Sequence, residues 1–284
     1  MPKDTVSVSI VAANYNNGRY LKEFVNSILG SSVLPEELII INDGSTDDSI
    51  EILDSFKDVT FLKVIKFKEN RGFCNALNAG VELASGKYIM RIDPDDIVFK
   101  HRIQKQYSYL ENNKDVDIVG SNVIYFHDET GENISKSNFP IHHNDIYKSY
   151  ANGEHGIQHP SALIRAEVMK KFKYYQDNFK SEDYDIFARM IVAGHKFANL
   201  PEPLTRMRVH GNSVSIHIKF ATIEQTFDLR DQIFNTTTSQ IKRKFYYWHI
   251  LNYKRYLIAK SPFAKLFYLV KSGVFYPSKV FKRI

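Results

Sequence analysis

The chain has 284 residues, enough for one large α/β domain with an appendage or for two modest domains. Hydrophobic residues make up 43% of it, which is ordinary for a globular protein and excludes disorder as the default state. The longest stretch without a charged side chain, 5–18, is shorter than the roughly 20 apolar residues that a membrane-spanning helix needs. No secretion signal is recognised at Met1, and the single cysteine, Cys74, excludes an internal disulfide, so we expect a cytoplasmic protein.

The net charge of +6 is distributed unevenly along the chain. Residues 1–231 contain 27 Lys and Arg against 32 Asp and Glu, whereas residues 232–284 contain 11 basic residues and no acidic one. The basic character therefore belongs to the C-terminal segment and not to the body of the protein.

The first hundred residues alternate short apolar runs with helical patterns. Strands are expected at 6–12, 38–42, 59–65 and 87–92, and helices at 20–29, just after 48 and at 73–84. This alternation predicts parallel βαβ units with right-handed crossovers, which bind ligands beyond the carboxyl ends of their strands. Ser45 and Thr46, followed by Asp47 and Asp48, are expected to cap the second helix.

After Asp96 the pattern becomes mixed. The elements expected there are a helix near 100–112, a strand near 117–126, a polar stretch to about 155, a strand at 161–164, a helix after Asp183 and a short strand ending at His210. From about residue 219 onward we expect helices, separated by Pro262 and Pro277.

The sharpest chemical signal is Asp93-Pro94-Asp95-Asp96, directly after an expected buried strand. Three carboxylates in four residues repel one another unless a positive charge lies among them, and a divalent cation with oxygen ligands would supply it. The alternative is a solvated acidic turn that caps the next helix.

Three further positions in this half allow a binding role or an ordinary structural one. Asp43 either accepts a hydrogen bond from a base N–H or caps a helix. Tyr15 either offers its ring to a nucleobase or packs between sheet and helix. Arg71, before Gly72 and a helix start, either favours an anion or lies on an ordinary loop.

Two candidates lie in the second half. Asp183, beside Glu182 at a helix start, either acts as a general base or stabilises the helix dipole. His210, at a strand end, either completes a metal shell begun by Asp95 or is structural.

The order of these motifs resembles glycosyltransferase family 2. The residues that carry the resemblance are Ala13-Asn14-Tyr15-Asn16, Asp43-Gly44-Ser45-Thr46-Asp47, Asn70-Arg71-Gly72 with Asn75 and Gly80, Asp93-Pro94-Asp95-Asp96, His159-Pro160-Ser161, Glu182-Asp183-Tyr184-Asp185 and Arg208-Val209-His210. They span 6–215, about three quarters of the chain. The resemblance implies an α/β protein with the GT-A fold, a Rossmann-like mixed sheet flanked by helices, and an inverting, nucleotide-sugar-dependent transferase.

The resemblance also implies a role for each candidate. The residues it assigns to the nucleotide-sugar are Ala13, Tyr15 and Asp43 at the base, Arg71 near the base or the phosphates, Asp93 at the ribose and Asp95 at the cation. Asp183 would be the catalytic base, and His210 would be a further contact of the Mn²⁺ or Mg²⁺ ion. We expect a UDP-sugar as donor and a hydroxyl of a lipid-linked or surface-polysaccharide precursor as acceptor.

The chain departs from the family pattern at two places. Ala12-Ala13 stands where the family often has Pro-Thr, so a threonine side-chain contact to the base is lost. The Gln-x-x-Arg-Trp signature of processive synthases is missing, since Lys244 follows Arg243, and we therefore expect non-processive transfer.

Two other functions were weighed against transfer. A sugar nucleotidyltransferase would need a Gly-rich basic signature near the N-terminus, and 12–19 contains a single glycine. A non-catalytic nucleotide-sugar binding protein would be expected to lose Asp95 or Asp183, and both are present.

We expect a catalytic domain at 1–215, with a donor half at about 1–100 and an acceptor half at about 101–215, followed by a helical extension at 216–284. The basic and aromatic residues of 232–284 would suit peripheral contact with an anionic membrane at the inner face of the cell membrane. They would equally suit packing of the extension on the catalytic domain. Nucleic-acid binding uses a similar composition, but no other part of the chain supports it.

Overall fold

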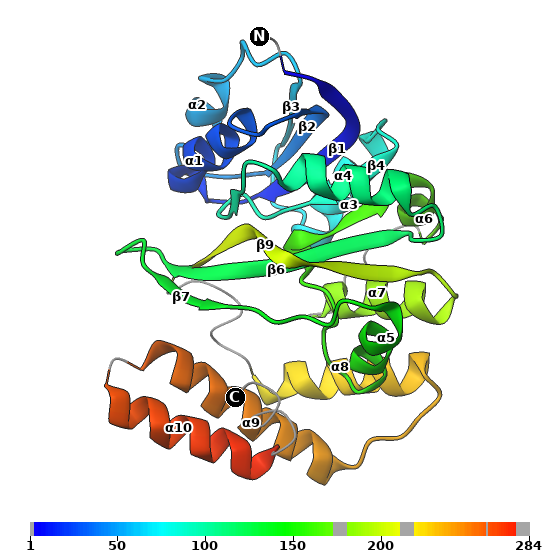
Figure 1. The fold of residues 1–284 in the computed structure, drawn as a ribbon. Coiled ribbons are helices and arrows are strands. Elements are labelled where there is room, and N and C mark those ends of the chain that lie inside the picture. Colours follow the sequence, from blue (N-terminus) through cyan, green and yellow to red (C-terminus); the bar gives the residue numbers. More distant parts are fainter. Residues whose placement is uncertain (1–2, 173–180, 211–218, 260, 277–284) are drawn as a thin grey trace.

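The computed structural model describes residues 3–172, 181–210, 219–259 and 261–276. Its centre is a nine-stranded sheet with the order β3-β2-β1-β4-β8-β6-β9-β5, in which β7 pairs with β6. Helices flank this sheet, and three more helices form the C-terminal end of the molecule (Figure 1). The expected α/β class and C-terminal helices are confirmed.

The N-terminal half is built from parallel strands joined by helical crossovers. The strands are β1 (Thr5–Asn14), β2 (Leu34–Asp43), β3 (Leu62–Phe67) and β4 (Tyr88–Arg91), and the crossovers contain α1 (Gly18–Leu29), α2 (Ser49–Asp54) and α3 (Phe73–Leu83). Alternate residues of β1 enter two separate cores, because side chains point to opposite faces along a strand. Ile10 packs with Leu21 of α1, whereas Val11 packs with Leu77 of α3. Both faces are thus covered, which explains the nearly continuous apolar run of β1.

The second half adds antiparallel strands. β8 (Leu163–Arg165) pairs antiparallel with β4 and with β6 (Ile118–His127), and β6 runs parallel to β9 (Phe197–Val209). β5 (Ile97–Val98) closes the far edge against β9. The remaining helices of this half are α4 (Arg102–Asn112), η1 (His159–Ser161), α6 (Ala166–Lys171) and α7 (Glu182–Val192).

Two sequence expectations differ from the structure. The last strand is not short, since β9 has 13 residues and pairs along the whole of β6. The polar stretch before 155 contains β7 (Asn133–Lys136) and α5 (His143–Ala151). Few apolar residues mark α5, but Ile146 and Tyr150 are fully buried, and these two anchors hold it on the core.

The expected cap of α2 is also wrong. Helix α2 begins at Ser49, and Ser45 Oγ instead donates to Asn42 Oδ1 at 2.7 Å. Asp47 accepts hydrogen bonds from the Gly18 N–H at 2.8 Å and the Ser49 N–H at 3.1 Å. The turn therefore joins the end of β2 to the start of α1, because Asn42 and Gly18 engage the side chains that a cap would use.

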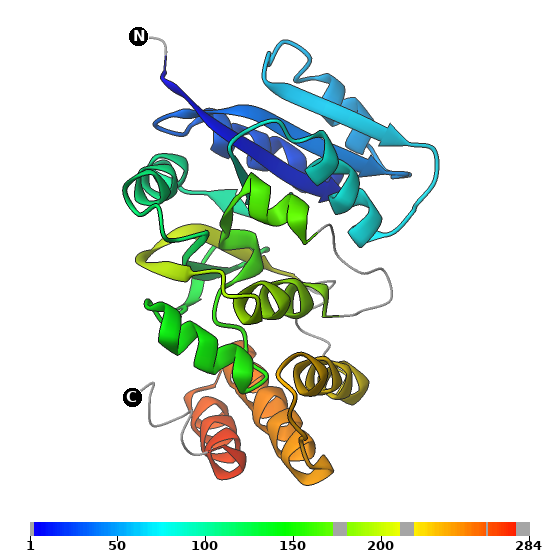
Figure 2. The same cartoon turned by 90° about the vertical axis from the view of Figure 1, so that its right-hand side faces the viewer.

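The C-terminal helices are α8 (Phe220–Ile233), α9 (Gln240–Ile258) and α10 (Pro262–Phe275). Pro262 opens α10 as expected, and Pro277 lies outside the described residues. Figures 1 and 2 agree that α9 and α10 lie side by side at the end of the molecule opposite β1, β2 and β3. Within the ranges given above, no helix is both long and apolar enough to cross a bilayer.

Candidate active site

The carboxyl ends of β1 and β2 are joined by a network of amide side chains. Asn14 Nδ2 donates to Asn42 Oδ1 at 2.8 Å and to Ser45 Oγ at 3.2 Å, and Asn14 is fully buried. Ala13 lies buried just before this network, whereas Tyr15, just after it, leaves 46% of its surface exposed. The sequence candidates Ala13 and Tyr15 therefore stand at a rigid strand end with an aromatic ring open to solvent.

Asp43, at the end of β2, holds the loop that precedes α3. Its two carboxylate oxygens accept hydrogen bonds from the backbone N–H groups of Arg71 at 2.7 Å and Gly72 at 2.9 Å. The Arg71 guanidinium lies over the Phe67 ring at 4.4 Å. The structure thus brings Asp43 and Arg71 together through the backbone, and each Asp43 oxygen retains a lone pair for a ligand.

The acidic turn after β4 forms a compact cluster. Asp93, Asp95 and Asp96 each offer a carboxylate oxygen, and these oxygens lie within 4.8 Å of one another. Arg91 Nη1 contacts Asp93 Oδ2 at 2.6 Å, which leaves the cluster incompletely neutralised. Burial, followed by the charge of Asp95, raises the pKa of Asp93 despite this arginine.

Asp96 is the most buried member of the cluster. One of its oxygens accepts the backbone N–H of Arg208 at 2.9 Å, and Oδ2 is buried with no hydrogen-bond partner in the described part of the chain. Burial first, and then the charges of Asp95 and Asp93, raise the pKa of Asp96 well above its ordinary value. Close, partly desolvated carboxylates with an unmatched buried oxygen fit a divalent cation, because such an ion prefers several oxygen ligands.

The end of β9 brings His210 to this cluster across 115 positions of sequence. His210 Nε2 lies 3.1 Å from Asp95 Oδ2, so the imidazole ring and the carboxylate are within hydrogen-bond distance of each other. Arg208 fixes the approach, since its Nε donates to the Asp95 carbonyl at 2.8 Å and its Nη1 contacts Asp128 at 3.0 Å. Asp95 and His210, which the sequence suggests as partners in a metal site, are therefore in contact in the structure.

Asp183 lies in the first turn of α7, and its side chain is one-third exposed. His155 Nδ1 lies 3.7 Å from Asp183 Oδ2. The charge of Asp183 is among the causes that raise the pKa of Asp93, so the two carboxylates are within electrostatic reach of each other. The structure thus places a partly exposed carboxylate within electrostatic reach of the acidic cluster.

Sequence reasoning gave no role to Arg91, Glu182 or His155. Arg91 is buried beside the Phe73 ring, and the signal for it was an arginine inside an otherwise apolar strand. Burial, followed by the charge of Asp183, raises the pKa of Glu182 to about 7. His155 gave no signal, because its contact with Asp183 depends on the fold.

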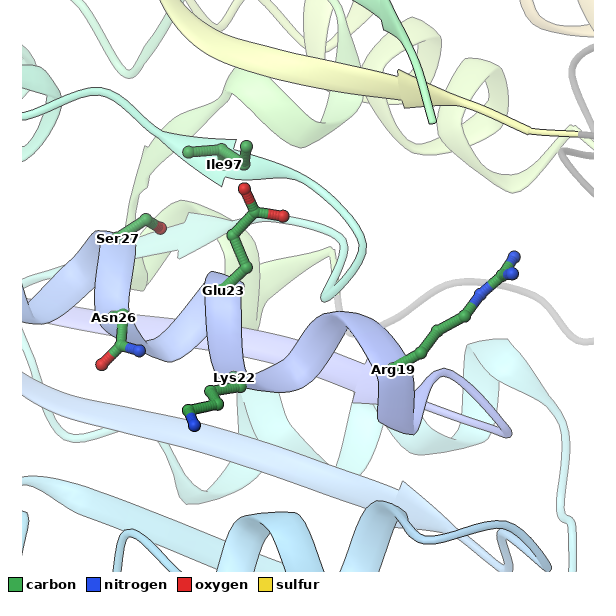
Figure 3. A pocket seen from close by; sticks show the side chains of 6 residues that line it. All are labelled: Arg19, Lys22, Glu23, Asn26, Ser27 and Ile97. Atoms are coloured by element: carbon green, nitrogen blue, oxygen red, sulfur yellow. The ribbon is translucent and has the colours of Figure 1, made fainter. Parts of the chain in front are cut away.

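A separate hollow of about 590 Å³ lies along α1 and β5. Its lining residues are Arg19, Lys22, Glu23, Asn26, Ser27 and Ile97. Figure 3 shows that the side chains on α1 point in different directions along the helix, and that Glu23 points toward Ile97 of β5. The hollow includes no member of the acidic cluster, so the candidate site is the carboxyl edge of the parallel strands.

Comparisons with known proteins find glycosyltransferases among the relatives of this chain. An uncharacterized glycosyltransferase of Methanocaldococcus jannaschii is 36% identical over 211 residues, which cover 72% of each chain. The UDP-Gal:alpha-D-GlcNAc-diphosphoundecaprenol beta-1,3-galactosyltransferase of Escherichia coli is 28% identical over 211 residues, covering 73% of this chain and 76% of that one.

Solved structures share the fold. TarS 1–349 of S. aureus, in complex with UDP-GlcNAc, superposes with a TM-score of 0.66 at 16% identity, covering 97% of this chain and 83% of that one. The mannosyltransferase PcManGT of Pyrobaculum calidifontis, in complex with GDP-Man and Mn²⁺, gives 0.61 at 14% identity, covering 96% and 74%. The GT-A fold expected from the sequence is confirmed.

The family model for glycosyl transferase family 2 matches residues 9–173. This segment contains the carboxyl end of β1, Asp43 at the end of β2 and the acidic turn after β4. With the relatives above, it establishes that the chain belongs to glycosyl transferase family 2.

Proposed function

We propose that this glycosyltransferase moves a sugar from a UDP-sugar to an acceptor hydroxyl, with inversion at the anomeric carbon, with a divalent cation and without processive elongation. The observation that carries the proposal is the acidic turn with His210 in contact with it and Asp183 of α7 within electrostatic reach. The UDP-GlcNAc complex of TarS and the UDP-Gal donor named for the Escherichia coli relative support the choice of UDP.

The nucleotide would occupy the ends of β1 and β2. The exposed Tyr15 ring offers a stacking face, and the backbone of Ala13 lies beside it. Asp43 would accept a base N–H with its remaining lone pairs, while Arg71 would face the base or the phosphates. Asp93 would accept hydrogen bonds from the ribose hydroxyls.

Asp95 and His210 would hold the cation, Mn²⁺ or Mg²⁺, with the unmatched oxygen of Asp96 beside them. When bound, the ion would neutralise charge on the diphosphate leaving group. The Mn²⁺ in the PcManGT complex supports this assignment.

Asp183 would act as the catalytic base. Its one-third-exposed carboxylate would accept the proton of the acceptor hydroxyl as that oxygen attacks the anomeric carbon and the bond to the diphosphate breaks. A single displacement of this kind inverts the anomeric centre. His155, 3.7 Å away, would hold the carboxylate in place.

The acceptor in this proposal is a lipid-linked or surface-polysaccharide precursor. The Escherichia coli relative is named for a diphosphoundecaprenol-linked acceptor, which supports this class. Residues 1–100 would supply the donor half and 101–215 the acceptor half of the catalytic domain. The extension, 216–284, would contact an anionic membrane through 232–284 at its inner face.

The test is a donor screen by thermal shift, with UDP-sugars and GDP-mannose in Mn²⁺, Mg²⁺ or chelator. A UDP-sugar is expected to raise Tm only when the metal is present, and Asp95→Ala is expected to abolish that shift while the apo Tm stays within a few degrees. Product release assayed with the same donors separates an enzyme from a binding protein. Stabilisation by no nucleotide under any metal would overturn the proposal.

A further inference from the structure

Helix α10 exposes an apolar stripe. Five large apolar side chains recur at i, i+3, i+4, i+7 and i+11, which places them on one face of a helix. We call this set the α10 stripe, and its members are Phe263, Leu266, Phe267, Val270 and Val274. Phe263 is 86% exposed and Val274 is 71% exposed, so the rest of the described chain leaves this face open.

The opposite face of α10 accounts for the packing of the helix. Ser272 is fully buried, and its Oγ lies 2.8 Å from Nδ1 of His249 in α9. Phe275 contacts two exposed aromatic residues of α9, with ring centroids 5.9 Å from Phe245 and 6.3 Å from Trp248. The apolar surface of α10 thus continues onto α9, and it is not needed to hold the two helices together.

The charged residues of α9 and α10 have one sign. Lys244, Arg255, Lys265 and Lys271 are exposed on the two helices, and 232–284 contains no acidic residue. Lys271 Nζ lies 4.5 Å from the centre of the Phe267 ring, at the border of the stripe. An apolar helical face bordered by cations is complementary to an anionic lipid surface.

Other basic residues of the extension are packed within the protein and contribute less to its basic surface. Arg243 contacts Asp228 at 2.5 Å and Asp231 at 2.9 Å, so it fastens α9 to α8. Lys254 is largely buried, and burial lowers its pKa to about 8. Composition alone therefore overstates the basic surface, because Arg243 is taken up by contacts within the described part of the extension.

A second copy of the chain is a poorer occupant for this face. In a twofold contact the same patch meets itself, so two stripes would bring their bordering lysines together without an acidic partner. We propose that the α10 stripe is a membrane-docking surface, which lies in the headgroup region of a bilayer that contains anionic lipid. Since α9 and α10 lie at the end opposite β1, β2 and β3, docking directs the nucleotide-binding end away from the bilayer (Figures 1 and 2).

This orientation gives the stripe a role in acceptor selection, a step that rests on the proposed transferase function. A lipid anchor would hold its hydroxyl-bearing headgroup at the surface on which the enzyme is docked. Water-soluble acceptors would gain nothing from docking.

The experiment measures co-sedimentation of the full chain with vesicles of phosphatidylglycerol and phosphatidylcholine, or of phosphatidylcholine alone. The test variant is Leu266→Ser/Val270→Ser/Val274→Ser. Its matched control, Leu83→Ser/Ile141→Ser/Val192→Ser, polarises three exposed aliphatic side chains on other elements. We expect at least tenfold weaker binding to the anionic vesicles for the test variant, and a change of less than twofold for the control. The wild type is expected to bind phosphatidylcholine alone at least tenfold more weakly.

Two results would overturn the inference. One is equal binding by the wild type and the test variant. The other is a wild-type dimer in sedimentation velocity that the test variant dissociates, with no vesicle binding, since a second copy would then cover the stripe. Nucleotide thermal shift on the same samples separates the proposals: stripe-dependent vesicle binding without nucleotide binding leaves the docking surface standing and removes the transferase proposal.

Discussion

At the start of α7, Glu182 and Asp183 are adjacent in sequence but differ in environment. One third of the Asp183 side chain is exposed beside His155, whereas burial raises the pKa of Glu182 to about 7. A base must reach the acceptor hydroxyl, which favours the exposed carboxylate. The pair therefore offers an internal control for the proposed mechanism.

Asp183→Asn is expected to lower kcat by about 10²- to 10⁴-fold, because the amide cannot accept the acceptor proton. Donor binding, measured by thermal shift with a UDP-sugar, is expected to remain. Glu182→Gln is the control and is expected to retain most of the turnover. The reverse pattern, with Glu182→Gln inactive and Asp183→Asn active, would assign the base to Glu182.

Glu182 also predicts a pH dependence of stability. Its pKa is raised from 4.5 to about 7 in the folded chain, so the folded state holds a proton that the unfolded state releases between these values. The free energy of unfolding is therefore expected to fall as pH rises through this window, by about 1–2 kcal/mol after allowance for solvent screening. Glu182→Gln should reduce the fall in the free energy of unfolding between pH 5 and pH 8 by this amount, measured by denaturant unfolding. An unchanged fall in the variant would contradict the assignment.

At the scale of elements, the turn after β2 depends on a close backbone approach. Gly44 has φ +67°, and a Cβ placed there would lie 2.4 Å from the backbone carbon of Glu69. Gly131 has nearly the same φ, +68°, with nothing within 4 Å of its Cβ position. Substitutions at these two glycines therefore separate the free-energy cost of a left-handed backbone from the free-energy cost of steric crowding.

Gly131→Ala is expected to cost about 1–2 kcal/mol for its positive φ alone. Gly44→Ala is expected to cost a further 1–3 kcal/mol or so, because the 69–72 loop must move from Asp43. Denaturant unfolding of both variants checks the difference, and nucleotide affinity should fall only for Gly44→Ala. Equal destabilisation of the two variants would show that the close approach is not required.

The elements themselves were predictable where the sequence pattern is local. The apolar run of β1 and the acidic turn after β4 follow from short-range periodicity and from repulsion between neighbouring carboxylates. Helix α5 was missed because its stability comes from two buried side chains on a polar segment. The contact of His155 with Asp183 was missed for a related reason, since tertiary packing alone brings these residues together.

At the scale of the whole molecule, a polar cluster joins α9 to α8 within the C-terminal extension. Asp231, at the end of α8, accepts hydrogen bonds from the hydroxyl of Thr238 at 2.7 Å and from Arg243 at 2.9 Å. It is also in contact with Arg230. Its removal would leave two largely buried arginines without this carboxylate.

Asp231→Ala is expected to destabilise the packing of α9 on α8 by about 2–3 kcal/mol, the scale of charged hydrogen bonds. Limited proteolysis should then cut faster within 234–239, while nucleotide-induced thermal shifts stay unchanged. Asp228→Ala is the control, because its side chain is 67% exposed and a surface ion pair contributes at most about 1 kcal/mol. Equal protease resistance of wild type and Asp231→Ala would refute this attachment.

The position of β5 has a consequence for recombining donor and acceptor specificities among relatives. β5 follows the acidic turn directly, yet it crosses to the far edge of the sheet, where Ile97 pairs with Arg206. A chimera joined near residue 100 would therefore take β5 from one parent and its partner strand from the other. Joining the parents at 92, before the turn, would let the acidic turn, β5 and His210 be inherited together as one unit.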